Sequence, residues 1–477
     1  MNYEKLSPAE QICEIMTRIY DARLTTVSGG NISVKDDEGN LWITPSGGDK
    51  GRYDLEDILC IKPDGEAIGA RKPSVETEIH KAILKSRPEF KAVVHAHPPA
   101  LVAMSFLREL PQLRLIPQVA GEVKEPRLAK YACPGTDELK DMVEKEFVEG
   151  KETNTAILEN HGAFVASEKG LKAAFGLFQD LDYSIQLQAK AHTYAEGKIN
   201  TITDEQLAEY NEATAHAYEG LEIERAISPF ESELEEVEPE AAIIYYFGED
   251  EEKEMRLRDE ICDFMYRGYG RGLFTQNIGV ISARIDEDSF LITQSGSDNA
   301  LLTAEQIVKV TGNQVEIWES GKSDDVNKQN DSEDVVHKLP SKSVLLHKKI
   351  YEENPDVNAI IMGAPANAMV FAITDYNYDL KTIPECYIVL REDISKFPFG
   401  ATYKQQAELA KYFKEKAPVA IVENDCFICT GSSVYNAFDK LEVLEFSAEA
   451  VVNAKLLGGN VKTITEEQAQ EIKNRFK

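Results

Sequence analysis

The chain has 477 residues, of which 43% are hydrophobic, and its formal net charge at pH 7 is −31. This length predicts two or three domains with sizeable cores, whereas the charge argues against binding to nucleic-acid phosphates or to anionic membrane surfaces. Residues 1–10 lack the apolar core of a signal peptide, no stretch approaches the roughly 18 apolar residues of a membrane span, and the cysteines are scattered, so we expect a cytoplasmic protein with reduced thiols.

Two glycine-containing motifs come early in the chain. The run 28–31 reads Ser-Gly-Gly-Asn and follows a helical pattern, and the run 44–48 reads Thr-Pro-Ser-Gly-Gly and follows a predicted strand over 41–43. Glycines let the backbone approach an anion closely, while N–H groups and hydroxyls supply donors. Each motif alone is typical of an ordinary turn, but together they resemble a phosphate cradle. Its candidate residues are Ser28, Gly29, Asn31, Ser46 and Gly47.

A helix is predicted over 75–86, because apolar residues recur on one of its faces. Ser74 is a natural N-cap, and the N–H groups of the first turn would favour a phosphate there. Glu76 lies in that turn, either as a carboxylate that stabilises the helix dipole or as a general base. His80, one turn later, is predicted to pack in the core or to support the site indirectly.

Three histidines carry the main chemical signal. His95 and His97 end the apolar run 90–94, and His161 follows the apolar run 155–158. If the first run is a strand, its side chains alternate, so His95 and His97 share one face about 6.5 to 7 Å apart. Three imidazoles with one open position predict a catalytic zinc, or another divalent metal, rather than a structural one. The alternative is that these histidines only pack.

The chain repeats itself once. Residues matching at an offset of 249 positions, and at 267 positions after a polar insertion near 320–332, indicate two homologous domains over 1–200 and 248–477. Between them, residues 201–247 are acidic and predict a largely helical linker. The residues that recur 249 positions later include Ile12, Cys13, Met16, Arg18, Tyr20, Leu24 and Thr26.

The second copy has lost the candidate metal site. By the repeat, Met362, Ala364 and Asp425 replace the three histidines, and Ser343 replaces Glu76. The signals of the fold persist while the ligands are gone, so we expect a second domain that serves assembly, stability or the far wall of the active site. The Cys426-x-x-Cys429 motif in this domain is predicted to be part of a buried strand.

Taken in this order, the motifs resemble the class II aldolase/adducin family. They are the Ser28–Asn31 loop, Thr44–Gly47, Pro73–Glu76, the His-x-His pair and the later His-Gly. The resemblance implies an α/β/α sandwich with a central, mainly antiparallel sheet, present twice in tandem. It also implies His95, His97 and His161 as zinc ligands, Glu76 as acid/base and in some members a fourth ligand, and phosphate contacts from Asn31, Ser46, Gly47 and Ser74. Tyr131 matches a tyrosine that family members offer to the site of a neighbouring subunit.

The chemistry that the resemblance implies is cleavage of a phosphorylated ketose, as in fuculose- and rhamnulose-phosphate aldolases. Zinc would stabilise an enediolate, Glu76 would move a proton, and Tyr131 would donate to the aldehyde oxygen. A decarboxylase, epimerase or dehydratase acting on a phosphorylated sugar or sugar acid could use the same metal site. A non-enzymatic, adducin-like interaction protein is a third hypothesis.

Family members form cyclic tetramers, which predicts a homo-oligomer for this chain. A dimer could build a ring of four domains in which intact and degenerate domains alternate. Tyr131 would then face a degenerate site, and the intact site would receive the residue that replaces Tyr131, which the repeat gives as Lys396.

Overall fold

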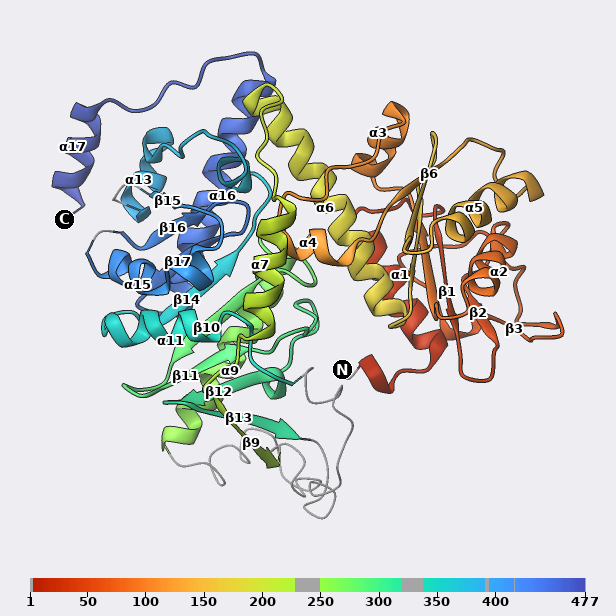
Figure 1. Ribbon diagram of the computed structural model, residues 1–477, viewed down its shortest axis with the longest axis horizontal. Helices are drawn as coiled ribbons and strands as arrows, with labels where there is room; N and C mark the ends of the chain where they lie inside the picture. The colour runs from red at the N-terminus through yellow and green to blue at the C-terminus, as the bar shows by residue number, and fades with distance from the viewer. Residues whose placement is uncertain (1–2, 228–248, 320–337, 391–393, 416, 477) are drawn as a thin grey trace. The chain divides into compact units, whose positions relative to one another are not determined.

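The computed structural model describes residues 3–227, 249–319, 338–390, 394–415 and 417–476. The chain divides into two compact units, Met1–Ala189 and Lys190–Lys477. Each unit has one large sheet with helices packed on it (Figure 1).

The first unit has an eight-stranded sheet in the order β4-β3-β2-β1-β5-β8-β7-β6. Neighbouring strands are antiparallel except β6 and β7, which are parallel. The strands are β1 (Asn31–Lys35), β2 (Leu41–Ile43), β3 (Leu59–Ile61), β4 (Ala67–Ile68), β5 (Ala92–Ala96), β6 (Arg127–Ala129), β7 (Thr155–Leu158) and β8 (Ala163–Ser167).

Helices cover both faces of this sheet. On one face, α2 and α5 pack together over apolar side chains of the central strands, including Ile43, Val93 and Phe164. On the other face lie α1, which begins at a capping box formed by Ser7 and Glu10, and α6 (Figure 1). The helices are α1 (Pro8–Asp21), α2 (Thr77–Ser86), α3 (Pro99–Leu107), α4 (Pro117–Glu122), α5 (Asp137–Glu149) and α6 (Leu171–Ala195).

The second unit has a nine-stranded sheet in the order β15-β16-β17-β14-β10-β11-β12-β13-β9. The pairs β15-β16 and β13-β9 are parallel and the other pairs are antiparallel. The strands are β9 (Glu222–Ile227), β10 (Val280–Arg284), β11 (Ser289–Thr293), β12 (Ile307–Thr311), β13 (Gln314–Glu319), β14 (Ala359–Gly363), β15 (Ser395–Phe397), β16 (Val419–Val422) and β17 (Cys426–Gly431).

The helices of the second unit follow the same plan. α11 and α15 pack over one face of the sheet, whereas α9 and α16 contact strands β10 and β14. The helices are α7 (Asp204–Ala215), α9 (Glu249–Gly270), α11 (Val344–Glu353), α12 (Met369–Ala372), α13 (Pro384–Leu390), α14 (Ala401–Lys404), α15 (Gln406–Glu415), α16 (Val434–Leu456) and α17 (Glu466–Arg475).

Equivalent strands of the two units pair in the same register. Asn31 lies opposite His95 in the first unit, and Val280 lies opposite Met362 in the second, which agrees with the offsets of 249 and 267. An isolated bridge that joins Pro45 to Pro73 recurs between Gln294 and Pro340. The expected fold class, an α/β/α sandwich present twice, is therefore confirmed.

The expectation of a helical linker over 201–247 needs correction. Its helix is present as α7, but residues 222–227 form β9, which pairs in parallel with β13 at the edge of the second sheet. β9 is the last strand of the sheet, and its residues Glu222, Ile223 and Glu224 are all exposed to solvent. The acidic run 231–240 and the polar insertion 320–332 lie outside the described residues.

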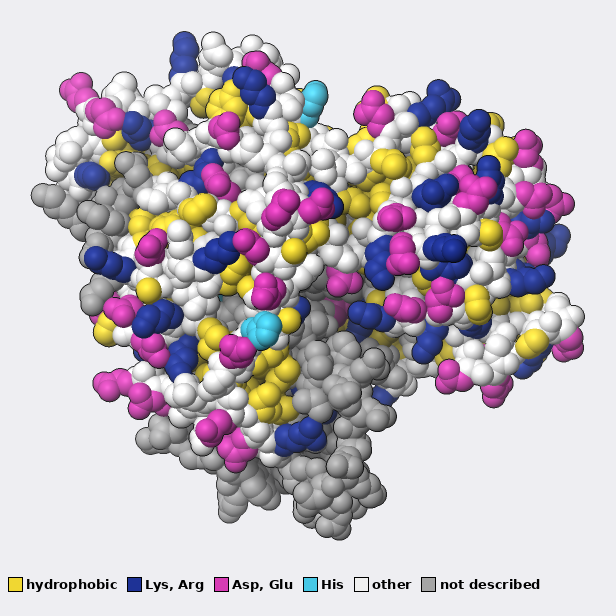
Figure 2. Space-filling view, in the orientation of Figure 1, with side chains coloured by type: hydrophobic (Ala, Val, Ile, Leu, Met, Phe, Trp, Pro, Cys, Tyr) yellow, Lys and Arg dark blue, Asp and Glu magenta, His cyan; other side chains and the backbone are white. Residues whose placement is uncertain are grey.

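Cys426 and Cys429 are free thiols buried in β17, as predicted. Acidic and basic side chains are interspersed on the face of the molecule drawn in Figure 2. Within the described ranges, every helix is too short or too polar to cross a membrane.

Candidate metal centre

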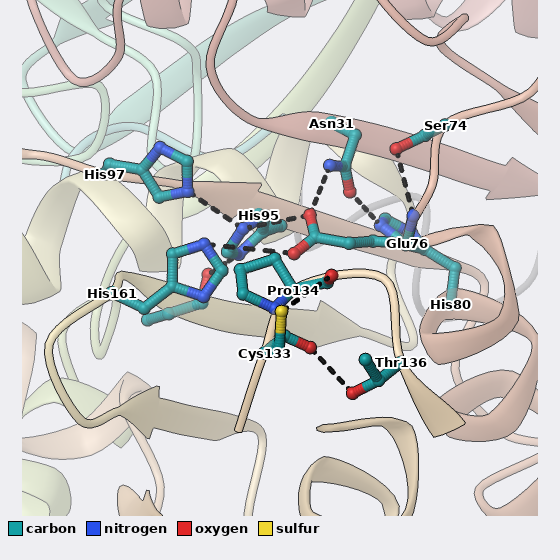
Figure 3. A network of polar contacts seen from close by, with 11 residues as sticks. Asn31, Ser74, Glu76, His80, His95, His97, Cys133, Pro134, Thr136 and His161 are labelled. Atoms are coloured by element: carbon teal, nitrogen blue, oxygen red, sulfur yellow. Dashed lines mark hydrogen bonds and ion pairs between the residues drawn. The ribbon is translucent and has the colours of Figure 1, made fainter. Parts of the chain in front are cut away.

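The three histidines come from β5 and from the turn beside it. His95 lies in β5, His97 follows the end of that strand, and His161 lies in the turn between β7 and β8 (Figure 3). Gly162 lets this turn approach β5, because a Cβ at position 162 would lie 2.3 Å from the Ala96 oxygen and 2.6 Å from His97 Cδ2. The absence of a side chain thus brings His161 to the other two rings.

The nitrogens of the three rings converge. One ligand atom from each histidine lies within 4.8 Å of the other two, and the Nε2 atoms of His95 and His97 are 3.0 Å apart. Bonds of about 2.1 Å in a tetrahedral site need ligand atoms about 3.4 Å apart. Small adjustments of the side chains therefore suffice for all three to bind one ion.

Hydrogen bonding and burial prepare these rings for a metal. His95 Nδ1 donates to the Ala163 oxygen at 2.9 Å, which leaves the Nε2 lone pair for a metal. Burial holds the pKa of His95 well below its usual value and lowers the pKa of His97 to about 3. Burial also lowers the pKa of His161. At neutral pH the imidazoles are uncharged, which is the form that binds metal.

Glu76 is the acidic group of the site. It is a buried N-cap residue of α2, with Oε2 3.2 Å from His95 Nε2 and Oε1 3.8 Å from His161 Nε2. Among the described residues, Oε1 has no hydrogen-bond partner. A buried, unpaired carboxylate oxygen beside neutral imidazoles fits a fourth metal ligand or a proton-transfer group.

A chain of hydrogen bonds holds Glu76 in place (Figure 3). Ser33 Oγ is 2.7 Å from His80 Nδ1, and His80 Nε2 is 2.6 Å from Asn31 Oδ1. Asn31 Nδ2 donates to Glu76 Oε2 at 2.7 Å. Because the Asn31 oxygen can only accept, His80 Nε2 is the donor and His80 Nδ1 accepts from Ser33. His80 therefore contacts Glu76 indirectly, through Asn31. Of the two alternatives for His80, this arrangement agrees with indirect support of the site.

Two predicted phosphate contacts have different surroundings from those expected. The side chain of Asn31 is engaged by Glu76 and His80. The helix begins at Thr77, not at Val75, so Ser74 is not its N-cap; Ser74 Oγ instead accepts from the backbone N–H of Glu76 at 3.3 Å. Both residues thus position the carboxylate.

The other cradle candidates lie on two loops, one before β1 and one after β2. Ser28, Ser46 and Gly47 are exposed. Gly29 packs against the metal site, because a Cβ there would lie 3.1 Å from His97 Nδ1. Three of the four therefore remain open to an anion, while the fourth lets the loop approach the histidines.

Two residues missed by the sequence analysis lie in the same region. Lys50 is only 2% exposed, although Ser46 to Asp49 are exposed, and its Nζ donates to Tyr53 Oη at 2.7 Å. The signal that could have found them is their replacement in the second copy by Asn299 and Leu302.

Tyr131 follows β6, and 57% of its surface is exposed. Its backbone N–H donates to Glu159 Oε2 at 3.3 Å. No contact between its ring and the three histidines is present in the described part of the chain. Tyr131 is therefore not a member of the cluster within its own unit.

The choice of Lys396 as the counterpart of Tyr131 is wrong. In the parallel ladders, Lys396 pairs with Ile421, whereas Leu128 pairs with Ile157. Ile157 and Ile421 are 264 positions apart, the same offset as His161 and Asp425, so Lys396 corresponds to Leu128. Its Nζ donates to two backbone carbonyls of its own unit, at 2.8 and 2.9 Å.

The second unit has a different set of side chains at the equivalent place. Met362 Sδ lies 3.2 Å from His347 Nε2, where the first unit has Asn31 beside His80. Asp425 accepts a hydrogen bond from Thr402 Oγ1 at 3.0 Å. The replacements predicted from the repeat thus occupy the equivalent strands and turn, and they provide no set of three imidazoles.

Comparison with known proteins gives a consistent result. The profile of the class II aldolase and adducin N-terminal domain matches residues 10–189 and again residues 259–452. The 3-oxo-tetronate 4-phosphate decarboxylase of Haemophilus influenzae is 29% identical over 204 residues, covering 42% of this chain and 93% of that protein. The 5-deoxy-D-ribulose 1-phosphate aldolase of Bacillus thuringiensis serovar kurstaki is 30% identical over 193 residues, covering 40% and 88%. The L-fuculose phosphate aldolase of Escherichia coli is 30% identical over 206 residues, covering 43% and 93%.

Proposed function

Because the chain belongs to the class II aldolase and adducin family, we propose that its first unit is a zinc-dependent lyase that cleaves a phosphorylated ketose. The observation that carries this proposal is the convergence of three neutral imidazoles beside a buried carboxylate with an unpaired oxygen. If the three histidines only packed in the core, a buried carboxylate beside them would have no purpose.

His95, His97 and His161 would hold the ion, which is Zn²⁺ or another divalent metal. The fit rests on the convergent nitrogens and on the uncharged state of the rings. When bound, the ion supplies Lewis-acid stabilisation of the negative charge that develops on substrate oxygens.

Glu76 is the proton-transfer group of the proposal. Asn31 fixes Oε2, so Oε1 is the atom that faces the reaction. In the cleavage direction, the carbon–carbon bond breaks, its electron pair goes to the ketose fragment, and Glu76 delivers a proton to the carbon of that fragment. In the condensation direction the Tyr131 phenol donates its proton to the aldehyde oxygen, and in the cleavage direction the Tyr131 phenolate takes that proton back from the hydroxyl group as the aldehyde forms. Because Tyr131 is exposed in its own unit, it would act on the site of another subunit in a homo-oligomer.

A decarboxylase is the second candidate function. The decarboxylase of Haemophilus influenzae and the two aldolases match this chain at nearly the same identity. Both reactions break a bond beside a carbonyl and leave negative charge on the same fragment, so the same residues serve either. An epimerase or a dehydratase remains a further alternative.

One experiment separates these functions. Zinc-loaded protein is incubated with a panel of ketose 1-phosphates, with dihydroxyacetone phosphate as the readout, and in parallel with a 3-oxo-tetronate 4-phosphate, with carbon dioxide as the readout. Glu76→Gln is expected to lower the active reaction by about 10²–10⁴-fold with zinc content unchanged. The matched variant Ser343→Ala, at the equivalent position of the second unit, should behave as the wild type. Absence of both products would reject the lyase.

A further inference from the structure

Lys50 is a buried lysine for which the proposed reaction has no role. It is the only lysine among the buried residues described for the first unit, and its charge is compensated by no salt bridge there. An ammonium group has three N–H donors, and Tyr53 Oη is the one acceptor that the described residues offer to it. Burial lowers the pKa of Lys50 to about 8, and the charge of Glu76 opposes this shift.

The location of Lys50 links it to the candidate anion loops. Its backbone N–H donates to the Val27 oxygen at 3.0 Å, which ties the loop that carries Ser46 to the loop that carries Ser28. Gly47, in the loop that carries Ser46, has a positive φ of 70° and no atom within 4 Å of where its Cβ would be. The acceptor of the Lys50 ammonium, Tyr53 Oη, lies 3.5 Å from the Gly47 oxygen, so this open part of the loop is close to the partner of the ammonium.

The second unit keeps this loop and lacks the ammonium. Asn299, which is equivalent to Lys50, donates from its backbone N–H to the Gln276 oxygen at 3.1 Å, just as Lys50 does to Val27. The Ser46-Gly47 pair is also retained, as Ser295-Gly296. The backbone therefore does not require a lysine, and the lysine was lost together with the metal ligands and Glu76.

An ammonium group that is buried with one neutral partner is unfavourable unless an anion compensates it. Glu76 supplies part of that charge, but its Oε2 is already held by Asn31 and lies beside His95. A dianion in the same site would in turn be repelled by Glu76. A cation between the two anions offsets both costs.

We propose that Lys50 binds the phosphate group of the substrate, with its ammonium donating to a phosphate oxygen held by the loops that carry Ser28 and Ser46. This inference rests on the proposed function, because the phosphate belongs to the same substrate. Lys50 supplies positive charge to a cradle whose exposed members, Ser28, Ser46 and Gly47, are all neutral.

The test is the affinity of the zinc-loaded protein for inorganic phosphate, measured by titration calorimetry. Lys50→Met, which keeps the apolar stem, is expected to weaken phosphate binding about 10- to 100-fold, because it removes a charge-assisted hydrogen bond. Lys50→Arg should stay within a few-fold of the wild type. Asn299→Ala, at the equivalent position in the second unit, should change nothing.

Zinc content and melting temperature of each variant show that the fold and the metal site are intact. Lys50→Gln, which removes the charge and keeps a polar side chain, serves if Lys50→Met folds poorly. Tyr53→Phe, which keeps the charge and removes its one hydrogen-bond acceptor, should retain phosphate binding. Phosphate affinity that is unchanged in Lys50→Met, or a wild type that does not bind phosphate, overturns the inference. If the wild type releases dihydroxyacetone phosphate while Lys50→Met keeps full phosphate affinity, the inference about Lys50 is wrong but the proposed lyase function stands. If phosphate binding depends on Lys50 but no lyase activity is found, the inference about Lys50 stands and the proposed lyase function is wrong.

Discussion

The two units share one backbone plan and differ in the chemistry placed on it. In both, a serine of the strand equivalent to β1 pairs with a buried histidine of the following helix, Ser33 with His80 and Ser282 with His347, each at 2.7 Å. Beyond that histidine the units diverge, because Asn31 of the first unit is replaced by Val280. The shared pair is therefore a feature of the fold, whereas the polar residues beyond it are present in the first unit alone.

A second shared feature supports this division. In the first unit, Asp182 of α6 accepts a hydrogen bond from the backbone of Leu101 at the start of α3. In the second, Glu445 of α16 accepts from the backbone N–H of Ala368, which is the equivalent of Leu101, at 2.7 Å. A buried carboxylate holds the segment after the β5 or β14 strand in both units, with or without a metal site.

The largest expected effect comes from removing one of the three candidate metal ligands of the first unit. His161→Ala should lower zinc content well below one ion per chain and reduce turnover by more than about 100-fold, because even the loss of groups around the ligands costs about 10–100-fold. Metal analysis and steady-state kinetics measure these two effects. Asp425→Ala, its match in the second unit, should leave both unchanged; equal zinc loss in the two variants would contradict the division.

A smaller effect is expected from replacing Asn31, which joins His80 to Glu76 through hydrogen bonds. Asn31→Val places in the first unit the residue that the second unit has, and it frees Glu76 from its donor. We expect turnover to fall about 10- to 100-fold, the cost typical of losing a supporting hydrogen bond, with folding retained. Val280→Asn in the second unit should not affect turnover, and a loss there would show that this unit takes part in the chemistry.

The exposed tyrosine tests how subunits combine. Tyr131→Phe removes a proton donor and should reduce turnover about 10-fold, which is less than the roughly 10²–10⁴-fold typical of a general acid. Lys396→Ala should change it by less than about 2-fold, because the ammonium of Lys396 is held by carbonyls of its own unit. Steady-state kinetics rank the two variants. Full turnover in Tyr131→Phe would instead favour the alternating ring, in which Tyr131 faces a degenerate site.

The smallest effect concerns the pair that the units share. Ser33→Ala and Ser282→Ala each remove a hydrogen bond to a buried imidazole, so each should lower the free energy of unfolding by about 1–2 kcal/mol. Denaturant unfolding of both variants gives the comparison. Strong destabilisation by one and none by the other would show that the pair does not have the same role in the two units.

The fold and the convergence of the three histidines could be predicted because the repeat and the histidine spacing are local patterns. The roles of Asn31 and Lys50 could not, because they depend on tertiary structure. Asn31 reaches Glu76 only through the pairing of β1 with β5 and the start of α2 at Thr77. Lys50 is buried although the residues just before it are exposed.

Two further errors have physical causes of the same kind. Residues 222–227 read as the end of a helix, yet pairing with β13 makes them a strand, since a neighbouring strand can override local preference. Lys396 was assigned to Tyr131 by sequence spacing, whereas the ladder shifts the equivalence to Leu128. Equivalent residues are therefore assigned wrongly from sequence spacing where a short strand lies next to loops of unequal length.

Gly162 has a consequence for whether the second unit could regain a metal. Its equivalent is Cys426, and at position 162 even a Cβ would collide with the Ala96 oxygen and the His97 ring. Histidines grafted at positions 362, 364 and 425 would thus still be kept apart by the side chain of Cys426. Restoring three convergent imidazoles would therefore need four changes in the second unit, at positions 362, 364, 425 and 426, because the histidines alone would not suffice.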